Sequence, residues 1–130
     1  MRGKQRPTYF VVRDGQILWF IPLSTKVEKY QMIIEQKIKK YGNCKTIMIE
    51  KLIDRDSVIL IQNAFPTLEK YIDHIHTIDG IPIKVREEVE KKIVANLNYM
   101  FSMKKKGINL FFSDVDKIKE KMLDELLVKN

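Results

Sequence analysis

The sequence has a single cysteine, Cys44, and no long apolar run. One cysteine cannot form a disulfide within the chain, and Cys44 has no Cys or His at zinc-finger spacing, which favours a reducing compartment. No segment reaches the about 20 apolar residues of a transmembrane helix, and polar residues follow Met1–Lys4 where a signal peptide would be hydrophobic. These absences predict a cytoplasmic protein that does not span a membrane.

The usual catalytic motifs are also missing. The chain has no His-Glu-x-x-His, no glycine-rich phosphate loop and no Gly-x-Ser-x-Gly, which argues against metalloproteases, NTPases and common hydrolases. His74 and His76 would share one side of a strand, and with Asp73 and Asp79 they could bind a metal or act as acid and base. The alternative is a solvent-facing polar stripe, and we expect no bound metal and no cofactor.

Charge is distributed unevenly along the chain. Residues 1–65 hold 12 Lys/Arg against 6 Asp/Glu, whereas residues 66–130 hold 12 against 11. A basic half suggests a polyanion on one face, with RNA or DNA ahead of an acidic protein or a membrane surface. The alternative is an ordinary solvated, lysine-rich surface. With 45% hydrophobic residues, no internal repeat and no low-complexity linker, residues 1–130 are expected to form one domain.

A hairpin is predicted near the start of the chain. Tyr9–Val12 and Ile17–Ile21 are rich in β-branched and aromatic residues, and Asp14-Gly15 between them is a strong turn signal. Pro22 lacks an N–H and is expected to end the second strand. The hairpin therefore fixes the direction of the residues that follow it.

Two hydroxyl side chains and a lysine follow this strand without a spacer. Ser24, Thr25 and Lys26 leave the sheet together, which is the kind of place where binding and catalytic groups are found. The alternative is that Ser24 or Thr25 only caps the next helix, because Ser and Thr are common N-caps.

Hydrophobic periodicity predicts the remaining elements. Helices are expected over 26–41, ended by Gly42-Asn43, over 85–104, and from a start at 113–116, with a short helical turn capped by Thr67. Strands are expected over 45–53 and 57–62. A strand-like piece is expected at 108–112, and a further strand is possible at 74–78. A turn is expected around 79–83. Strands in hairpins followed by helices predict an α+β fold, a curled antiparallel sheet or partly open barrel with inserted and C-terminal helices, rather than a parallel doubly wound sheet.

The order of these pieces resembles the endoribonuclease toxins of type III toxin–antitoxin systems, the group that includes ToxN, AbiQ and CptN. The resemblance spans nearly the whole chain and depends on order and spacing more than on one motif. Its matching pieces are Arg6-Pro7-Thr8-Tyr9, Trp19 to Lys26, Ile59 to Pro66, and Asn109 to Lys117.

The resemblance implies a compact SH3-like barrel related to the MazF/Kid toxins. It implies metal-independent RNA cleavage through the 2′-hydroxyl of RNA, with mRNA as substrate and Ser24, Thr25 and Lys26 as the catalytic loop. It also implies inhibition by a small repetitive antitoxin RNA, processed by the toxin and held with it in a cyclic assembly. Residues expected to bind RNA are Lys4, Arg6 and Lys29 at phosphates, Tyr9, Phe65 or Tyr99 at bases, and Asn63.

The order of Ser24, Thr25 and Lys26 departs from the usual order in the family. The family more usually has Thr before Ser with a lysine further on, whereas Ser24 precedes Thr25 here and lysines stand at 26 and 29. The resemblance thus leaves open whether Lys26 or Lys29 acts in cleavage. A second function, a non-catalytic RNA- or DNA-binding module with a basic N-terminal face, is also consistent with the charge.

Overall fold

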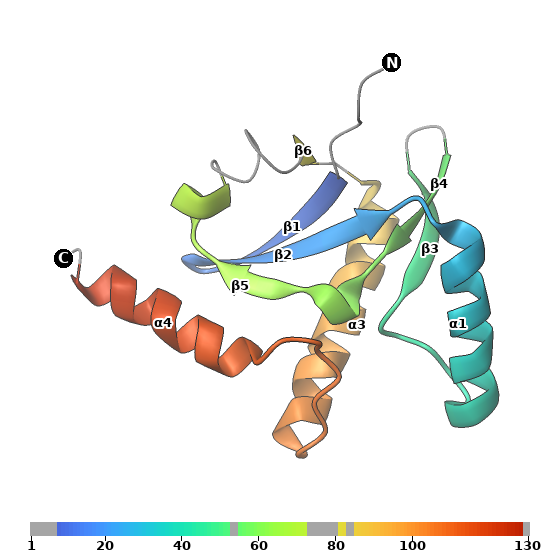
Figure 1. Ribbon diagram of the computed structural model, residues 1–130. Coiled ribbons are helices and arrows are strands. Elements are labelled where there is room, and N and C mark those ends of the chain that lie inside the picture. Colours follow the sequence, from blue (N-terminus) through green and yellow to red (C-terminus); the bar gives the residue numbers. More distant parts are fainter. Residues whose placement is uncertain (1–7, 53–54, 73–80, 83–84, 129–130) are drawn as a thin grey trace.

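The structure is a computed structural model of the 130-residue chain and describes residues 8–52, 55–72, 81–82 and 85–128. Its strands are β1 (Thr8–Asp14), β2 (Ile17–Ser24), β3 (Met48–Leu52), β4 (Arg55–Ile59), β5 (Phe65–Thr67) and β6 (Ile81–Pro82). Its helices are α1 (Val27–Tyr41), α3 (Glu87–Lys105) and α4 (Val115–Val128), with a 3-10 turn η1 (Ile61–Asn63) and a short helical segment at 69–72. The strands form one curled, mostly antiparallel half-barrel, so the α+β prediction is confirmed (Figure 1).

The predicted hairpin is β1 and β2. The two strands pair antiparallel from Tyr9 opposite Pro22 to Asp14 opposite Ile17. Gly15 adopts a φ of 64°, a conformation that glycine reaches without steric cost and that hairpin turns of this length require. The turn therefore sets the register that brings the end of β2 to one corner of the sheet.

Strand β2 is longer than predicted, because Pro22 does not end it. One edge of β2 pairs with β5 at Phe20 opposite Phe65 and then with β4 at Leu23 opposite Ile59. Pro22 lies where this edge changes partner, and its carbonyl accepts a hydrogen bond from the Leu60 N–H at 3.0 Å. Since the N–H and C=O of one residue point to the same side of a strand, the missing N–H falls where no ladder bond is needed.

Two short strands were not predicted. Residues 65–67 form β5 where a loop and a helix cap at Thr67 were expected. Strand β6 lies within the expected turn and pairs parallel to β1, with Thr8 opposite Ile81. Both depend on pairing with strands that are distant in the sequence, which local propensity does not report. The possible strand at 74–78 lies outside the described residues.

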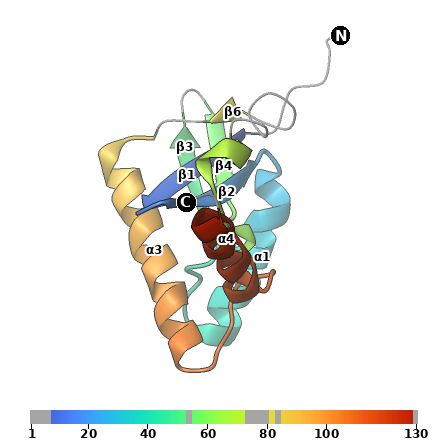
Figure 2. The same ribbon diagram turned by 90° about the vertical axis from the view of Figure 1, so that its left-hand side faces the viewer.

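Helix α3 covers one face of the sheet, as the two views show (Figures 1 and 2). The helix predicted over 85–104 is confirmed, and Val89, Ile93, Leu97 and Met100 form its buried stripe. These side chains share the main core with the inward residues of β2, of which Trp19 is the largest. The face of β2 that carries Ile17, Trp19, Ile21 and Leu23 is therefore packed against this core.

Helix α1 lies on the other side of the sheet, over β3 and β4. Val27, Tyr30 and Ile34 pack on a second, smaller core, but no residue of α1 is itself buried. Ile38 and Tyr41 were expected to face inward and are instead 47% and 65% exposed. The C-terminal part of α1 therefore projects beyond the sheet.

Gly42 ends α1 as predicted, in a left-handed conformation with a φ of 87°. A Cβ at this position would have no neighbour within 4 Å, so the cost of a side chain is the backbone conformation alone. Gly42→Ala should lower the free energy of unfolding by about 1 kcal/mol, measured by urea denaturation. Asn43→Ala at the adjacent exposed residue should change it by less than about 0.5 kcal/mol. Equal stability of the two variants would contradict this conformation of Gly42.

The predicted strand-like piece at 108–112 is wrong. These residues form a loop in which the Asn109 side chain accepts a hydrogen bond from the Phe111 N–H at 3.0 Å. The Phe112 N–H donates to the Gln62 carbonyl at 2.9 Å, which ties the loop to η1. The following helix α4 begins as expected, with the Asp114 side chain accepting a hydrogen bond from the Lys117 N–H at 3.2 Å.

Candidate functional site

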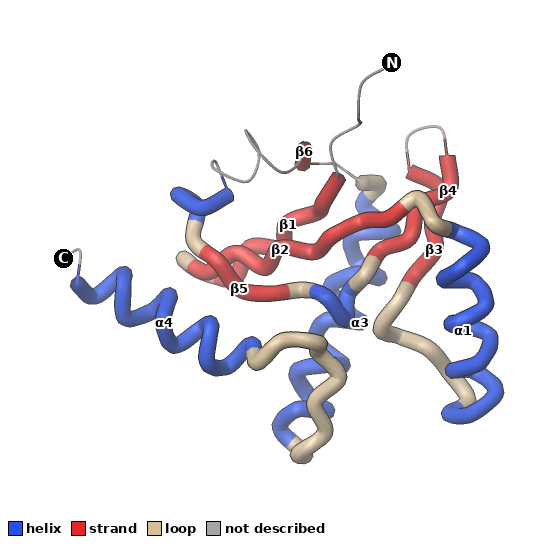
Figure 3. The backbone as a smooth tube through the Cα atoms, viewed as in Figure 1, coloured by secondary structure: helices blue, strands red, loops and turns tan. Residues whose placement is uncertain are grey.

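The end of β2 passes into α1 through two residues, Thr25 and Lys26 (Figure 3). Ser24, the last residue of β2, lies opposite Val58 of β4, so the sheet anchors the start of this connection. The site loop, defined here as Ser24, Thr25 and Lys26, is therefore short and held by a strand on one side and a helix on the other.

Neither hydroxyl of the site loop caps α1. The N-cap is Lys26, with φ −82° and ψ 65°, and no side chain caps the helix. The Ser24 Oγ instead accepts a hydrogen bond from the Lys26 N–H at 3.1 Å, which closes the loop on itself. The expectation that Ser24 or Thr25 serves as an ordinary helix cap is thus wrong.

The polar groups of Thr25 and Lys26 are available to a ligand. Both residues are exposed, and within the described ranges the Thr25 hydroxyl makes no hydrogen bond and the Lys26 ammonium makes no hydrogen bond or ion pair. The Ser24 hydroxyl accepts one bond but keeps its own O–H as a donor. The loop thus presents two hydroxyl donors and one positive charge at a single corner of the fold.

Three aromatic rings form a row on the same face of the sheet as Ser24. The Phe20 ring stacks on Tyr9 at a centroid distance of 4.4 Å and lies 5.0 Å from Phe65. Phe20 and Ser24 share a face because strand side chains alternate, and Tyr9 joins them because it is paired with Pro22. We call Tyr9, Phe20 and Phe65 the aromatic row.

The members of the aromatic row differ in exposure. Phe20 and Phe65 are half-buried, and Tyr9 is completely buried. The Phe20 ring lies between the other two, so a base could stack on Phe65 at the end of the row. Phe20 was not among the predicted residues, although its period-two spacing from Ser24 was visible in the sequence.

The positive charge near the site loop is not neutralised locally. Within the part of the chain that the structure describes, no lysine of α1 forms an ion pair. Several cations of the second half do, including Arg86 with Glu50 and Lys104 with Asp116. Lys29, in the first turn of α1, is exposed and its ammonium lies 5.1 Å from the Tyr30 ring centroid. The structure therefore keeps the uneven charge of the sequence.

The other predicted binding residues lie in different places. Asn63 is half-buried in η1, two residues before Phe65. Tyr99 belongs to α3, on the opposite side of the sheet from the aromatic row, and the Lys45 ammonium lies 4.6 Å from its ring centroid. Lys4 and Arg6 lie outside the described residues. Lys29 thus lies one helical turn from the site loop and Phe65 lies against Phe20, whereas Tyr99 is separated from both.

No metal site is formed by the residues that the structure describes, among which no three His, Cys, Asp or Glu side chains cluster. His74 and His76, with Asp73 and Asp79, lie outside those residues. In the described part of the chain, no helix combines the length and the apolar composition that crossing a bilayer requires.

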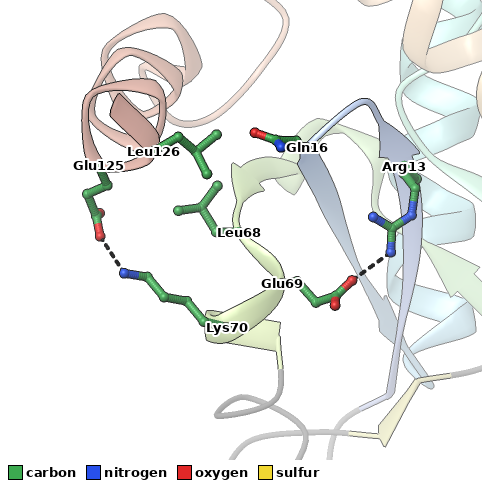
Figure 4. Close-up of a pocket in the computed structure, with 7 residues that line it drawn as sticks. All are labelled: Arg13, Gln16, Leu68, Glu69, Lys70, Glu125 and Leu126. Carbon is green, nitrogen blue, oxygen red and sulfur yellow. Dashed lines mark hydrogen bonds and ion pairs between the residues drawn. The ribbon is translucent and has the colours of Figure 1, made fainter. Parts of the chain in front are cut away.

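A hollow of about 330 Å³ lies between the β1–β2 hairpin and α4 (Figure 4). Arg13 pairs with Glu69 at 2.8 Å, and Lys70 pairs with Glu125 at 3.0 Å. The Tyr71 hydroxyl donates to Glu125 at 2.6 Å, and this hydrogen bond to a carboxylate raises the pKa of Tyr71. The positive charges of Arg13 and Lys70 are balanced by the carboxylates of Glu69 and Glu125. The hollow is therefore a poorer candidate for binding a polyanion than the site loop.

No protein-family model matches the chain, and no curated protein matches its sequence.

Proposed function

We propose that the protein is a metal-independent endoribonuclease that acts as the toxin of a type III toxin–antitoxin system, with an SH3-like barrel of the MazF/Kid kind. The observation that carries the proposal is the site loop, which offers two hydroxyls and an unpaired ammonium at the corner of a face that also bears the aromatic row. The curled antiparallel half-barrel and the sequence resemblance support the same conclusion.

The loop has groups that can bind the phosphate and stabilise negative charge in such a cleavage. The 2′-oxygen of the RNA bonds to phosphorus and loses its proton, while the bond from phosphorus to the 5′-oxygen breaks and that oxygen gains a proton. The protein must therefore align the attack, assist the proton transfer and stabilise the charge on the phosphorane. Thr25 and Ser24 can donate hydrogen bonds to phosphate oxygens, and Lys26 can supply positive charge to the same group. No histidine or metal is needed for these tasks.

The surroundings of the loop fit single-stranded RNA. Unpaired bases stack on partly exposed aromatic rings, and Phe65 offers such a ring on the face of the sheet that carries Ser24. The unpaired lysines of α1 suit neighbouring phosphates. We extend the proposal to cytoplasmic mRNA as substrate and to a small repetitive antitoxin RNA that covers the loop in a cyclic assembly of toxin and RNA.

Cleavage in the presence of a chelator tests this function. The purified protein should cut single-stranded RNA in excess EDTA and leave 2′,3′-cyclic phosphate ends, because the loop supplies charge without a metal. A Thr25→Ala variant purified in the same way controls for contaminating nucleases. A strict requirement for a divalent metal would contradict the mechanism and return attention to His74 and His76. RNA binding without any cleavage would favour the non-catalytic binding module.

A further inference from the structure

A half-buried lysine ammonium bridges α1 and η1. The Lys37 Nζ donates to the Thr46 Oγ1 at 3.2 Å and to the Gln62 Oε1 at 3.1 Å. Thr46 and Gln62 are buried, at 7% and 5% exposure, and the Gln62 N–H donates to the Thr46 carbonyl at 2.9 Å. The ammonium is thus fixed by two acceptors that are themselves held in place.

Both acceptors of Lys37 are uncharged. Within the described residues, no carboxylate contacts its ammonium. A partly desolvated cation is costly unless an anion compensates it, and two neutral oxygens satisfy only two of its three N–H donors. The position therefore leaves one donor and a full positive charge for an external anion.

Lys37 lies about three helical turns along α1 from the site loop. It follows Lys26, the N-cap residue of α1, by 11 residues. The rise between them is about 16 Å, which corresponds to no more than about five nucleotides of a stacked strand. One strand of nucleic acid can therefore reach both cations.

Two aromatic residues are linked to Gln62, one of the acceptors of the Lys37 ammonium. Gln62 is followed by Asn63 and then, two residues later, by Phe65 of the aromatic row. The Phe112 N–H donates to the Gln62 carbonyl, and the Phe112 side chain is 71% exposed. A fixed cation with exposed aromatic rings is typical of surfaces that bind single-stranded nucleic acid rather than acidic protein.

We propose that Lys37, held by Thr46 and Gln62, is a second phosphate-binding subsite for single-stranded RNA, on a track that runs from the site loop along α1 to η1. The inference rests on the proposed function for the identity of the polymer, and it adds a residue outside the site loop. Lys37 binds and positions the strand, and takes no part in bond breaking.

A binding assay that does not depend on cleavage tests the subsite. A labelled, fully 2′-O-methylated RNA of about 12 nucleotides cannot be cut through its 2′ positions and fits the usual footprint of such surfaces. Lys37→Met keeps the aliphatic stem and should weaken its binding by about tenfold, with the salt slope reduced by about 0.7. Lys37→Gln should weaken binding to the same extent, and it replaces Lys37→Met in the assay if that variant does not fold. The control is Lys39→Met, on the opposite, exposed face of α1.

The possible results test the Lys37 subsite and the nuclease function separately. Wild-type affinity and salt slope in both Lys37 variants, with earlier melting, would make Lys37 a structural tie and overturn the subsite. Equal losses in Lys39→Met, or losses with single-stranded DNA but not with RNA, would also overturn it. A wild-type protein that binds RNA through Lys37 but cuts none would support the subsite and contradict only the nuclease proposal.

Discussion

Replacing Thr25 by alanine should lower the rate of RNA cleavage by about 100- to 1,000-fold, the usual cost of losing one hydrogen-bond donor to a transition state. The free energy of unfolding should change by less than about 0.5 kcal/mol, since the Thr25 side chain is exposed and its hydroxyl contacts no other described residue. The measurement is a cleavage time course beside a urea denaturation curve for the same preparation. Activity should thus be lost without loss of the fold.

Two further variants show whether the Thr25 hydroxyl itself is responsible. Thr25→Ser keeps the hydroxyl and should retain most of the activity, whereas Ser102→Ala removes an exposed hydroxyl from α3 and should retain all of it. Ser24→Ala should lose both activity and some stability, because its Oγ accepts the Lys26 N–H. Full cleavage and growth inhibition in Thr25→Ala would place the active site elsewhere.

Replacing Lys26 by alanine should lower cleavage by at least about 100-fold and also weaken the retention of antitoxin RNA, because one cation serves both the reacting phosphate and the bound strand. Lys29→Ala, one helical turn away, should weaken retention and leave cleavage close to that of the wild type. Salt titrations of RNA binding, run beside a cleavage assay, measure both effects. Each lost phosphate contact should reduce the slope by about 0.7.

The control for the two lysines is Lys39→Ala, which removes the same charge from an exposed position about 15 Å further along α1 than Lys29. Its salt slope and its cleavage rate should equal those of the wild type. Unchanged slopes in all three variants, or toxin assemblies that persist after RNase treatment, would assign the basic half to ordinary solvation. Lys29→Ala that loses cleavage as fully as Lys26→Ala would make Lys29 the catalytic cation instead.

Local patterns were enough to predict the elements that fold on local signals. The Asp14-Gly15 turn, the stripe Val89, Ile93, Leu97 and Met100, and the end of α1 at Gly42 each depend on a few neighbouring residues. The failures share another cause. Pro22 continues β2 because β4 and β5 meet beside it, and the residues at 108–112 lack a strand partner and bond to Gln62 instead. Such pairing is decided by distant parts of the chain.

The candidate site also has a part that the sequence could predict and a part that it could not. Ser24, Thr25 and Lys26 are consecutive, so the sequence could place them together at the end of a strand. Phe20 belongs to the candidate site because its ring lies against Phe65 of β5, and Lys37 belongs to it because its ammonium donates to Gln62 in η1. Both contacts join residues that are more than 20 positions apart, which spacing alone does not reveal.

RNA that lacks a single 2′-hydroxyl provides the most direct measurement of how the site loop would cut. Once a cleaved bond has been mapped, the same oligonucleotide is made with a 2′-deoxy sugar on the 5′ side of that bond and incubated with the protein in EDTA. If the RNA supplies the nucleophile, cleavage at that bond should stop while other sites are still cut. Continued cleavage at the deoxy position would show that water or a protein group attacks the phosphate, and would contradict the proposed mechanism.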